Sequence, residues 1–216
     1  MHTISVGICT YKRPDLLIKC LESIIFQEKI KINQIIVVDN DILKSGATVI
    51  SILNEKKQLK DINLVYEVEE KKGVSSARNK VVSLNKSDLL AFIDDDETAD
   101  PFWLINLYNT YIKYKPDAVY GNIIYITPKE YEKSHKGLFK SKIGALKTGQ
   151  NLNLCSTGNV LINRDILKLR NGPFNEELNN IGGEDTELFQ FLKIKYNCTY
   201  IYCNEAKVSE YQSKER

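Results

Sequence analysis

The chain has 216 residues, of which 43% are hydrophobic and 27% are charged, and its formal net charge is +2 at pH 7. A chain of this size can bury one sizeable core, so we expect a single domain over residues 1–216. The near balance of charges gives no sign of a nucleic-acid partner, and no apolar run approaches the roughly 18 residues of a membrane-spanning helix.

The first half of the chain alternates between predicted strands and helices. Apolar runs typical of strands buried on both faces are Ile4–Cys9, Gln34–Val38, Ile62–Glu67 and Leu89–Asp94. The stretches that we expect to be helical follow them, at Pro14–Ile25, Ala47–Lys57, Gly73–Leu84 and Asp100–Tyr114. This alternation, at about thirty residues per unit, predicts an α/β fold with a mostly parallel central sheet covered by helices.

The pattern changes after Lys115-Pro116-Asp117. The further elements that we predict are strands at Ala118–Thr127, Asn159–Asn163, Tyr200–Cys203 and Ala206–Val208, and a helix at Glu184–Lys195. A long polar segment follows the first of these strands, and residues 129–147 within it carry six lysines against two glutamates. A loop of this length in a compact domain is usually functional or mobile. Residues 212–216 end without a stop signal, so a truncated C-terminus is one expectation.

The cysteines indicate the compartment. Cys9, Cys20, Cys155, Cys198 and Cys203 are odd in number and form no CxxC pair. We therefore expect reduced, structural thiols rather than disulfides or a zinc site. The first residues lead directly into a predicted strand, which leaves no room for a signal peptide, so we expect a cytoplasmic protein.

The most informative motif is Asp94-Asp95-Asp96-Glu97, which directly follows the apolar run Leu89–Ile93. In open parallel sheets, ligands bind at the carboxyl ends of the strands. Four adjacent carboxylates repel one another, and Mn²⁺ or Mg²⁺ held by one or two of them, together with a ligand diphosphate, would relieve that repulsion. The alternative is a solvated acidic loop before the helix that Asp100-Pro101 introduces.

Four further motifs lie at predicted strand ends or at the starts of helices. They are Cys9–Pro14, Val37–Asn40, Lys72–Asn79 and Gly182–Glu187. Because the carboxyl ends of parallel strands share one edge of the sheet, those that follow strands can face the same crevice as the acidic motif.

This ordered set of motifs resembles the inverting family 2 glycosyltransferases of the GT-A fold, a Rossmann-like fold of nucleotide-diphospho-sugar transferases. It is most similar to the bacterial polysaccharide and glycolipid enzymes whose acidic motif reads Asp-Asp-Asp-Glu. The resemblance covers nearly the whole chain and implies a nucleotide-binding half, 1–115, and an acceptor-side half, 116–216. It implies metal-dependent transfer of a sugar, from a donor that we expect to be UDP-linked, to a glycan or lipid-linked acceptor at the inner face of the cell membrane.

The resemblance also implies roles for individual residues. Asp96 would hold Mn²⁺ or Mg²⁺, Asp94 would reach the ribose, and Asp185 would be the catalytic base, with Glu184 beside it. Many members of the family place a late histidine on the metal, but no histidine follows His135 here. The residues expected to bind the donor are Thr10, Tyr11, Arg13, Asp39, Arg78, Asp94 and Asp95.

Plainer interpretations exist for these residues. Asp39 is compatible with a turn cap, Arg78 with a helix-surface arginine and Tyr11 with packing alone. Glu184 and Asp185 are compatible with first-turn acids that complement the helix dipole.

Two other classes of function remain open, as does the role of the lysine-rich segment. Asp94-x-Asp96-x-Thr98 also fits the nucleophile motif of haloacid-dehalogenase-type phosphatases, although that family places the motif after its first strand. A non-catalytic nucleotide-sugar-binding fragment would keep the donor pocket but lack a competent base. Residues 129–147 form either a solvated face or a contact for an anionic acceptor or the membrane surface.

Overall fold

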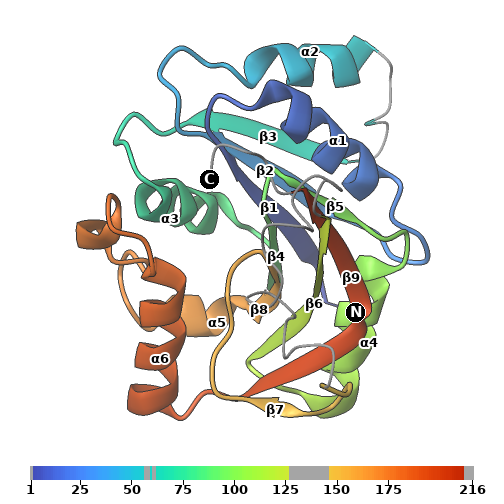
Figure 1. Ribbon diagram of the computed structural model, residues 1–216, viewed down its shortest axis with the longest axis vertical. Coiled ribbons are helices and arrows are strands. Elements are labelled where there is room, and N and C mark those ends of the chain that lie inside the picture. Colours follow the sequence, from blue (N-terminus) through green and yellow to red (C-terminus); the bar gives the residue numbers. More distant parts are fainter. Residues whose placement is uncertain (1, 56–58, 60–61, 127–145, 212–216) are drawn as a thin grey trace, which may run out of the picture.

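The computed structural model describes residues 2–55, 59, 62–126 and 146–211. Within these residues, nine strands form one sheet in the order β3-β2-β1-β4-β8-β6-β9-β5, and β7 pairs with β9 off this path (Figure 1). The strands are β1 Ile4–Thr10, β2 Gln34–Asp39, β3 Asn63–Val68, β4 Leu89–Ile93, β5 Glu97–Ala99, β6 Ala118–Ile126, β7 Asn151–Leu152, β8 Asn159–Asn163 and β9 Tyr200–Tyr211. The helices are α1 Pro14–Ile25, α2 Ala47–Glu55, α3 Val74–Leu84, α4 Trp103–Tyr114, α5 Arg164–Leu167, the 3-10 helix η2 Glu176–Leu178, and α6 Glu184–Tyr196.

The sheet is mostly parallel, as predicted. The strands β1, β2, β3 and β4 pair in parallel, β8 joins β4 to β6 with antiparallel pairings on both sides, and β9 pairs in parallel with β6. Six of the nine strands in the described residues therefore point the same way, and β5, β7 and β8 run against them. One sheet thus takes its strands from both predicted halves of the chain.

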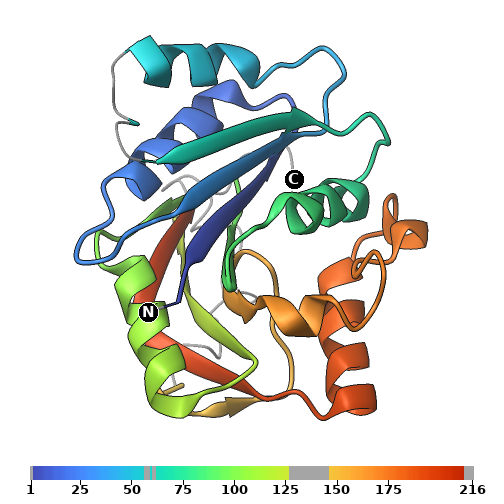
Figure 2. The ribbon, with the colours of Figure 1, turned by 180° about the vertical axis from the view of Figure 1, so that it is seen from behind.

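Helices cover both faces of the sheet (Figures 1 and 2). Apolar side chains of α1, α2 and α4 pack in one buried cluster with residues such as Ile8 and Val37. Those of α3, α5 and α6 pack in a second cluster with residues such as Ile36 and Phe92. Neighbouring strand residues therefore point into different cores, which explains why the central strands are continuous apolar runs without alternation.

Several elements differ from the prediction. The single strand β9 replaces the two short strands expected at Tyr200–Cys203 and Ala206–Val208. The polar pair Asn204-Glu205 looks like a break in the sequence, but a register shift against β6 between Gly121 and Asn122 keeps the pairing continuous. The elements β5, β7, α5 and η2 were not predicted, because they are too short to show periodicity.

The last strand supports the acidic motif. Glu97, Thr98 and Ala99 of β5 pair with the end of β9, and the amide of Tyr211 donates to the carbonyl of Asp96 over 3.2 Å. The backbone on the carboxyl side of the acidic motif is therefore fixed by residues more than a hundred positions later in the chain.

Most of the lysine-rich segment predicted at 129–147 lies outside the described residues. Among the residues that the structure does describe, no helix has the length and apolar character needed to cross a bilayer.

Candidate functional site

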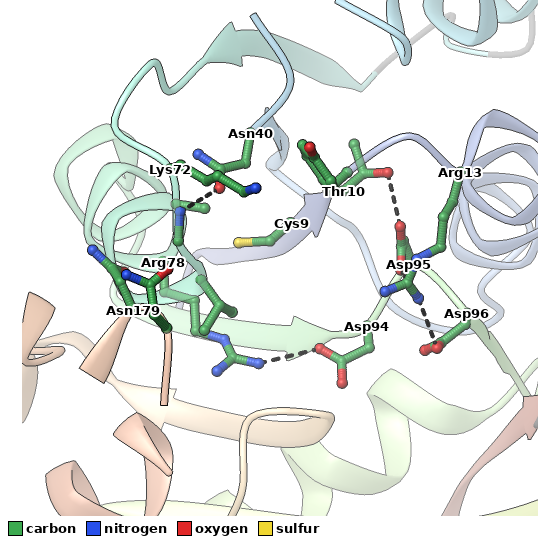
Figure 3. Close-up of a pocket in the computed structure, with 15 residues that line it drawn as sticks. Cys9, Thr10, Arg13, Asn40, Lys72, Arg78, Asp94, Asp95, Asp96 and Asn179 are labelled. Atoms are coloured by element: carbon green, nitrogen blue, oxygen red, sulfur yellow. Dashed lines mark hydrogen bonds and ion pairs between the residues drawn. The ribbon is translucent and has the colours of Figure 1, made fainter. Parts of the chain in front are cut away.

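A cavity of about 290 Å³ opens at the carboxyl ends of β1, β2 and β4 (Figure 3). Its walls come from the β1–α1 loop, the start of α3, the acidic motif and the loop before α6. The lining residues are Cys9, Thr10, Tyr11, Arg13, Asn40, Lys72, Gly73, Val74, Ala77, Arg78, Asp94, Asp95, Asp96, Asn179 and Asn180. Motifs that are far apart in the sequence therefore meet at one edge of the sheet, where open α/β folds bind their ligands.

The acidic motif forms a tight turn between β4 and β5. The Glu97 amide donates to the Asp94 carbonyl over 3.1 Å, and the Asp94 amide donates to Glu97 Oε2 over 3.0 Å. Asp95, Asp96 and Glu97 are all buried, whereas the Asp94 side chain is half-buried. The interpretation of this motif as a solvated acidic loop is therefore wrong, because the pairing of β5 with β9 draws it into the fold.

Positive and hydroxyl groups of the β1–α1 segment compensate two of these acids. Arg13 Nη1 lies 3.2 Å from Asp95 Oδ1 and 2.9 Å from Asp96 Oδ2, and Thr10 Oγ1 donates to Asp95 Oδ2 over 2.8 Å. Burial raises the pKa of Asp95 to about 6, even though Arg13 and the Thr10 hydroxyl act in the opposite direction. Burial likewise raises the pKa of Glu97, and the neighbouring charge of Asp94 adds to that rise.

Arg78 forms ion pairs with both the acidic motif and the start of α6, the helix that carries the predicted catalytic base. Its guanidinium is buried, lies 3.4 Å from Asp94 Oδ1, and forms an ion pair with Glu184 at the start of α6. The ring of Phe174 lies below it, 5.9 Å from the guanidinium carbon. Arg78 is therefore not a helix-surface arginine. Its position on α3 lets one cation hold acids from two separate segments.

Tyr11 lies at the mouth of the cavity and is 38% exposed. The ammonium groups of Lys12 and Lys72 lie 5.2 and 5.6 Å from the centre of its ring. A partly exposed aromatic ring beside two cations provides a flat surface for a base and positive charge for an anion.

Asp39 is fully buried and does not line the cavity. Its carboxylate accepts hydrogen bonds from Gly46 N at 2.7 Å, the Tyr66 hydroxyl at 2.8 Å and Asp41 N at 3.0 Å. These contacts agree with the turn-cap interpretation. They hold the loop that follows β2. Asn40, the residue after Asp39, does line the cavity, and its Oδ1 accepts from the Gly73 amide over 2.7 Å.

The start of α6 carries the predicted base. Gly182 and Gly183 have φ values of +80° and +85°, in the left-handed region that favours glycine, and nothing lies within 4 Å of a Cβ built on either residue. Asp185 is half-buried, and its carboxylate accepts from the amides of Thr186 at 2.6 Å and Thr157 at 3.4 Å. Neither Asp185 nor Glu184 is among the lining residues of the cavity.

Lys72, Asn179 and Asn180 line the cavity, but none of them was predicted to bind the donor. Asn179 is anchored against the start of α3, because its Oδ1 accepts from Ser76 N over 3.1 Å and its Nδ2 donates to Ser76 Oγ over 2.9 Å. The available signal was two adjacent asparagines just before the Gly182-Gly183 pair, which is typical of a loop that faces a ligand.

The acids at the cavity fit a hard divalent cation that shares its shell with a ligand. Within the described part of the chain, no group of three or more His, Cys, Asp or Glu residues is placed to hold a metal ion. Mg²⁺ and Mn²⁺ need no such cage, because they are commonly held by one or two carboxylates, water and substrate phosphates. The lining carboxylates Asp94 and Asp96 provide donors of that kind.

Comparisons with known proteins give a consistent result. Residues 5–170 match the family model described as "Glycosyl transferase family 2". The chain is 30% identical over 194 residues to "Succinoglycan biosynthesis protein ExoM" of Rhizobium meliloti (strain 1021), which covers 86% of this chain and 60% of that protein. It is 28% identical over 133 residues to "Poly(ribitol-phosphate) beta-glucosyltransferase" of Bacillus spizizenii, which covers 61% of this chain and 20% of that protein. The chain therefore spans 60% or less of the length of these two relatives.

Solved structures share the fold. S. aureus TarS 1–349 in complex with UDP-GlcNAc superposes with a TM-score of 0.75 at 17% identity, over 99% of this chain and 60% of that one. The same protein in complex with UDP gives a TM-score of 0.73 at 18% identity, over 98% of this chain and 61% of that one. At this level of identity, the likeness establishes the fold alone.

Proposed function

Because this chain belongs to glycosyl transferase family 2 and is a glycosyltransferase, we propose that it moves a sugar from a UDP-linked donor to a glycan or lipid-linked acceptor, with a divalent metal ion and with inversion at the anomeric carbon. The observation that carries this proposal is the cavity in which Tyr11, Arg78 and the acids Asp94 and Asp96 meet at the carboxyl edge of the sheet. The product would contribute to a cell-surface polysaccharide or glycolipid.

The donor would lie along this cavity. Tyr11 offers its exposed ring to the uracil, Asp94 its carboxylate to the ribose, and Arg78 its charge to the phosphates. Asp96 would hold Mn²⁺ or Mg²⁺, which when bound neutralises the diphosphate as it leaves. The TarS complexes support the choice of UDP, since that protein of the same fold binds UDP and UDP-GlcNAc.

Transfer itself needs a base on the acceptor side. The acceptor oxygen forms a bond to the anomeric carbon as the bond to the diphosphate oxygen breaks, and the acceptor's hydroxyl proton passes to the Asp185 carboxylate. Attack opposite to the leaving nucleotide inverts the configuration. The carboxylate of Glu184 is committed to Arg78, which supports Asp185 as the base.

The two alternative functions, a phosphatase and a non-catalytic binding fragment, have less support than sugar transfer. The match to glycosyl transferase family 2 argues against the phosphatase interpretation of Asp94. Asp185, at the start of α6, argues against a non-catalytic nucleotide-sugar-binding fragment, and turnover of the donor decides between the two. The proposal is tested by thermal denaturation with UDP-, GDP- and dTDP-sugars, each with and without Mn²⁺. A bound donor stabilises the folded state by mass action, so a UDP-sugar with Mn²⁺ should raise the melting temperature most. A larger effect from a GDP- or dTDP-sugar would overturn the choice of UDP.

Asp39 is proposed to form the base pocket, either directly or through the loop that it holds. Asp39→Ala should weaken UDP binding by about 1.5–3 kcal/mol, as expected for lost hydrogen bonds to a charged group. Calorimetric titration with UDP measures this change. Tyr66→Phe is the matched control, because it removes one hydrogen bond to Asp39 and keeps the carboxylate. Equal losses in both variants would mean that Asp39 acts only by holding the loop, and undiminished UDP binding by Asp39→Ala would place the pocket elsewhere.

The lysine-rich segment 129–147 is proposed to contact the membrane surface or an anionic acceptor. Lys140→Gln with Lys142→Gln should lower binding to liposomes of anionic phospholipid, measured by co-sedimentation. The binding should weaken as salt rises, because surface charges are screened over about 10 Å at 0.1 M ionic strength. Lys113→Gln with Lys115→Gln removes the same charge from the exposed end of α4 and should have little effect. Salt-independent binding would return the segment to the solvated-face interpretation.

A further inference from the structure

Arg13 is the cation in direct contact with two buried acids of the motif. One nitrogen, Nη1, reaches both Asp95 Oδ1 at 3.2 Å and Asp96 Oδ2 at 2.9 Å (Figure 3). Both acids are buried, and buried carboxylates are costly unless an opposite charge accompanies them. The guanidinium therefore acts as a built-in counter-charge for the acidic turn.

The backbone of Arg13 is fixed, but its side chain has room to move. The Arg13 carbonyl accepts from the amides of Leu16 at 3.1 Å and Leu17 at 3.0 Å, at the start of α1, and Pro14 follows directly. The side chain is 40% exposed and lines the cavity. The guanidinium can thus leave the acids by side-chain rotation alone.

A divalent cation on Asp96 would meet this guanidinium at the same carboxylate. Two positive groups this close repel each other, so a metal ion alone competes with Arg13 for the site. A nucleotide diphosphate changes the balance, because it brings negative oxygens to which an arginine can bind in a bidentate manner.

We propose that Arg13 is a positioning residue that occupies the cation's place on Asp95 and Asp96 until a nucleoside diphosphate draws its guanidinium away. This inference rests on the proposed metal-dependent function. Its consequence is linkage: the metal binds weakly by itself and tightly with the nucleotide, and the nucleotide gains the same factor from the metal. Arg13 would thereby keep the acidic turn closed to metal ions until a donor is present.

The test is titration of the full chain with Mn²⁺, with and without UDP, following free Mn²⁺ by electron paramagnetic resonance. Arg13→Gln removes the competing charge, so Mn²⁺ alone should bind about 5-fold tighter than to the wild type. The factor by which UDP tightens Mn²⁺ binding should fall by about 10-fold, within the usual range of coupling between two sites. Arg13→Lys keeps the charge, so its affinity for Mn²⁺ and its response to UDP should lie between those of the wild type and Arg13→Gln. This variant preserves the test if the glutamine variant folds poorly.

Lys19→Gln is the matched control, because it removes the same charge from α1, the helix that Arg13 precedes. Lys19 is exposed and does not line the cavity. Unchanged or weaker Mn²⁺ binding by Arg13→Gln would overturn the inference, and so would an equal gain in Lys19→Gln, which would indicate a general effect of charge. No Mn²⁺ binding by the wild type, even with UDP, would instead overturn the metal-dependent function and this inference with it.

Discussion

Asp185→Asn is expected to lose sugar transfer by about 10²–10⁴-fold, the usual contribution of a positioned general base. The acceptor hydroxyl has a high pKa, so its proton has to leave as the new bond forms. Asparagine keeps the shape of the side chain and one oxygen to accept from the Thr186 or Thr157 amide, but it cannot take up the proton. The loss should therefore fall on turnover and spare the binding of UDP and Mn²⁺.

The measurement is UDP release from a UDP-sugar with and without a glycan acceptor, with donor binding titrated in parallel. Glu184→Gln is the informative comparison, since it leaves the buried Arg78 with one acid partner fewer. We expect this variant to lose stability and donor affinity rather than turnover alone. If Glu184→Gln binds donor normally but is inactive while Asp185→Asn transfers sugar, the two roles are exchanged. If both variants transfer sugar normally, the base does not lie at the start of α6.

Asp96→Ala is expected to remove the gain in UDP affinity that Mn²⁺ gives, a loss on the order of 10–100-fold. The reason is that Asp96 is the proposed protein ligand of the metal. The fold should survive, because the hydrogen bond from the Tyr211 amide to the backbone carbonyl of residue 96 does not depend on the side chain. Titration of UDP with and without Mn²⁺ measures the loss, and circular dichroism checks the fold.

Asp15→Asn provides the control for Asp96→Ala. Asp15 is exposed in the first turn of α1, close in sequence to Arg13, and it does not line the cavity. Its removal changes the net charge by the same amount and should leave the response to Mn²⁺ intact. A response to Mn²⁺ that persists in Asp96→Ala would move the metal to another acid of the motif.

The sequence was sufficient to predict those elements whose pattern lies within a few consecutive residues. The apolar run Leu89–Ile93 followed by four acids identified both β4 and the edge of the sheet at which the cavity opens, because strand burial and the acidic motif lie in adjacent residues. The four alternating units before Lys115 were predictable for the same reason, since each strand and helix carries its own periodicity.

Contacts between distant segments could not be predicted. The strand β5 forms only because β9 pairs with it, and the sequence Glu97-Thr98-Ala99 has no strand pattern of its own. The sequence left a helix-surface position open as an alternative for Arg78, because its partner Glu184 lies 106 residues later in the chain. The bridge from Arg13 to Asp95 and Asp96 likewise depends on how the β1–α1 loop lies over the acidic turn.

The pairing of β9 with the residues that follow the acidic turn has a consequence for folding during protein synthesis. Most residues that line the cavity, from Cys9 to Asp96, leave the ribosome early, but β5 and the carbonyl of Asp96 find their partners only in Val208–Tyr211. Contacts over such long separations form late, because the intervening chain has to be ordered first. A nascent chain would therefore complete its acidic turn only after β9 has emerged, although most residues of the cavity lining are translated much earlier.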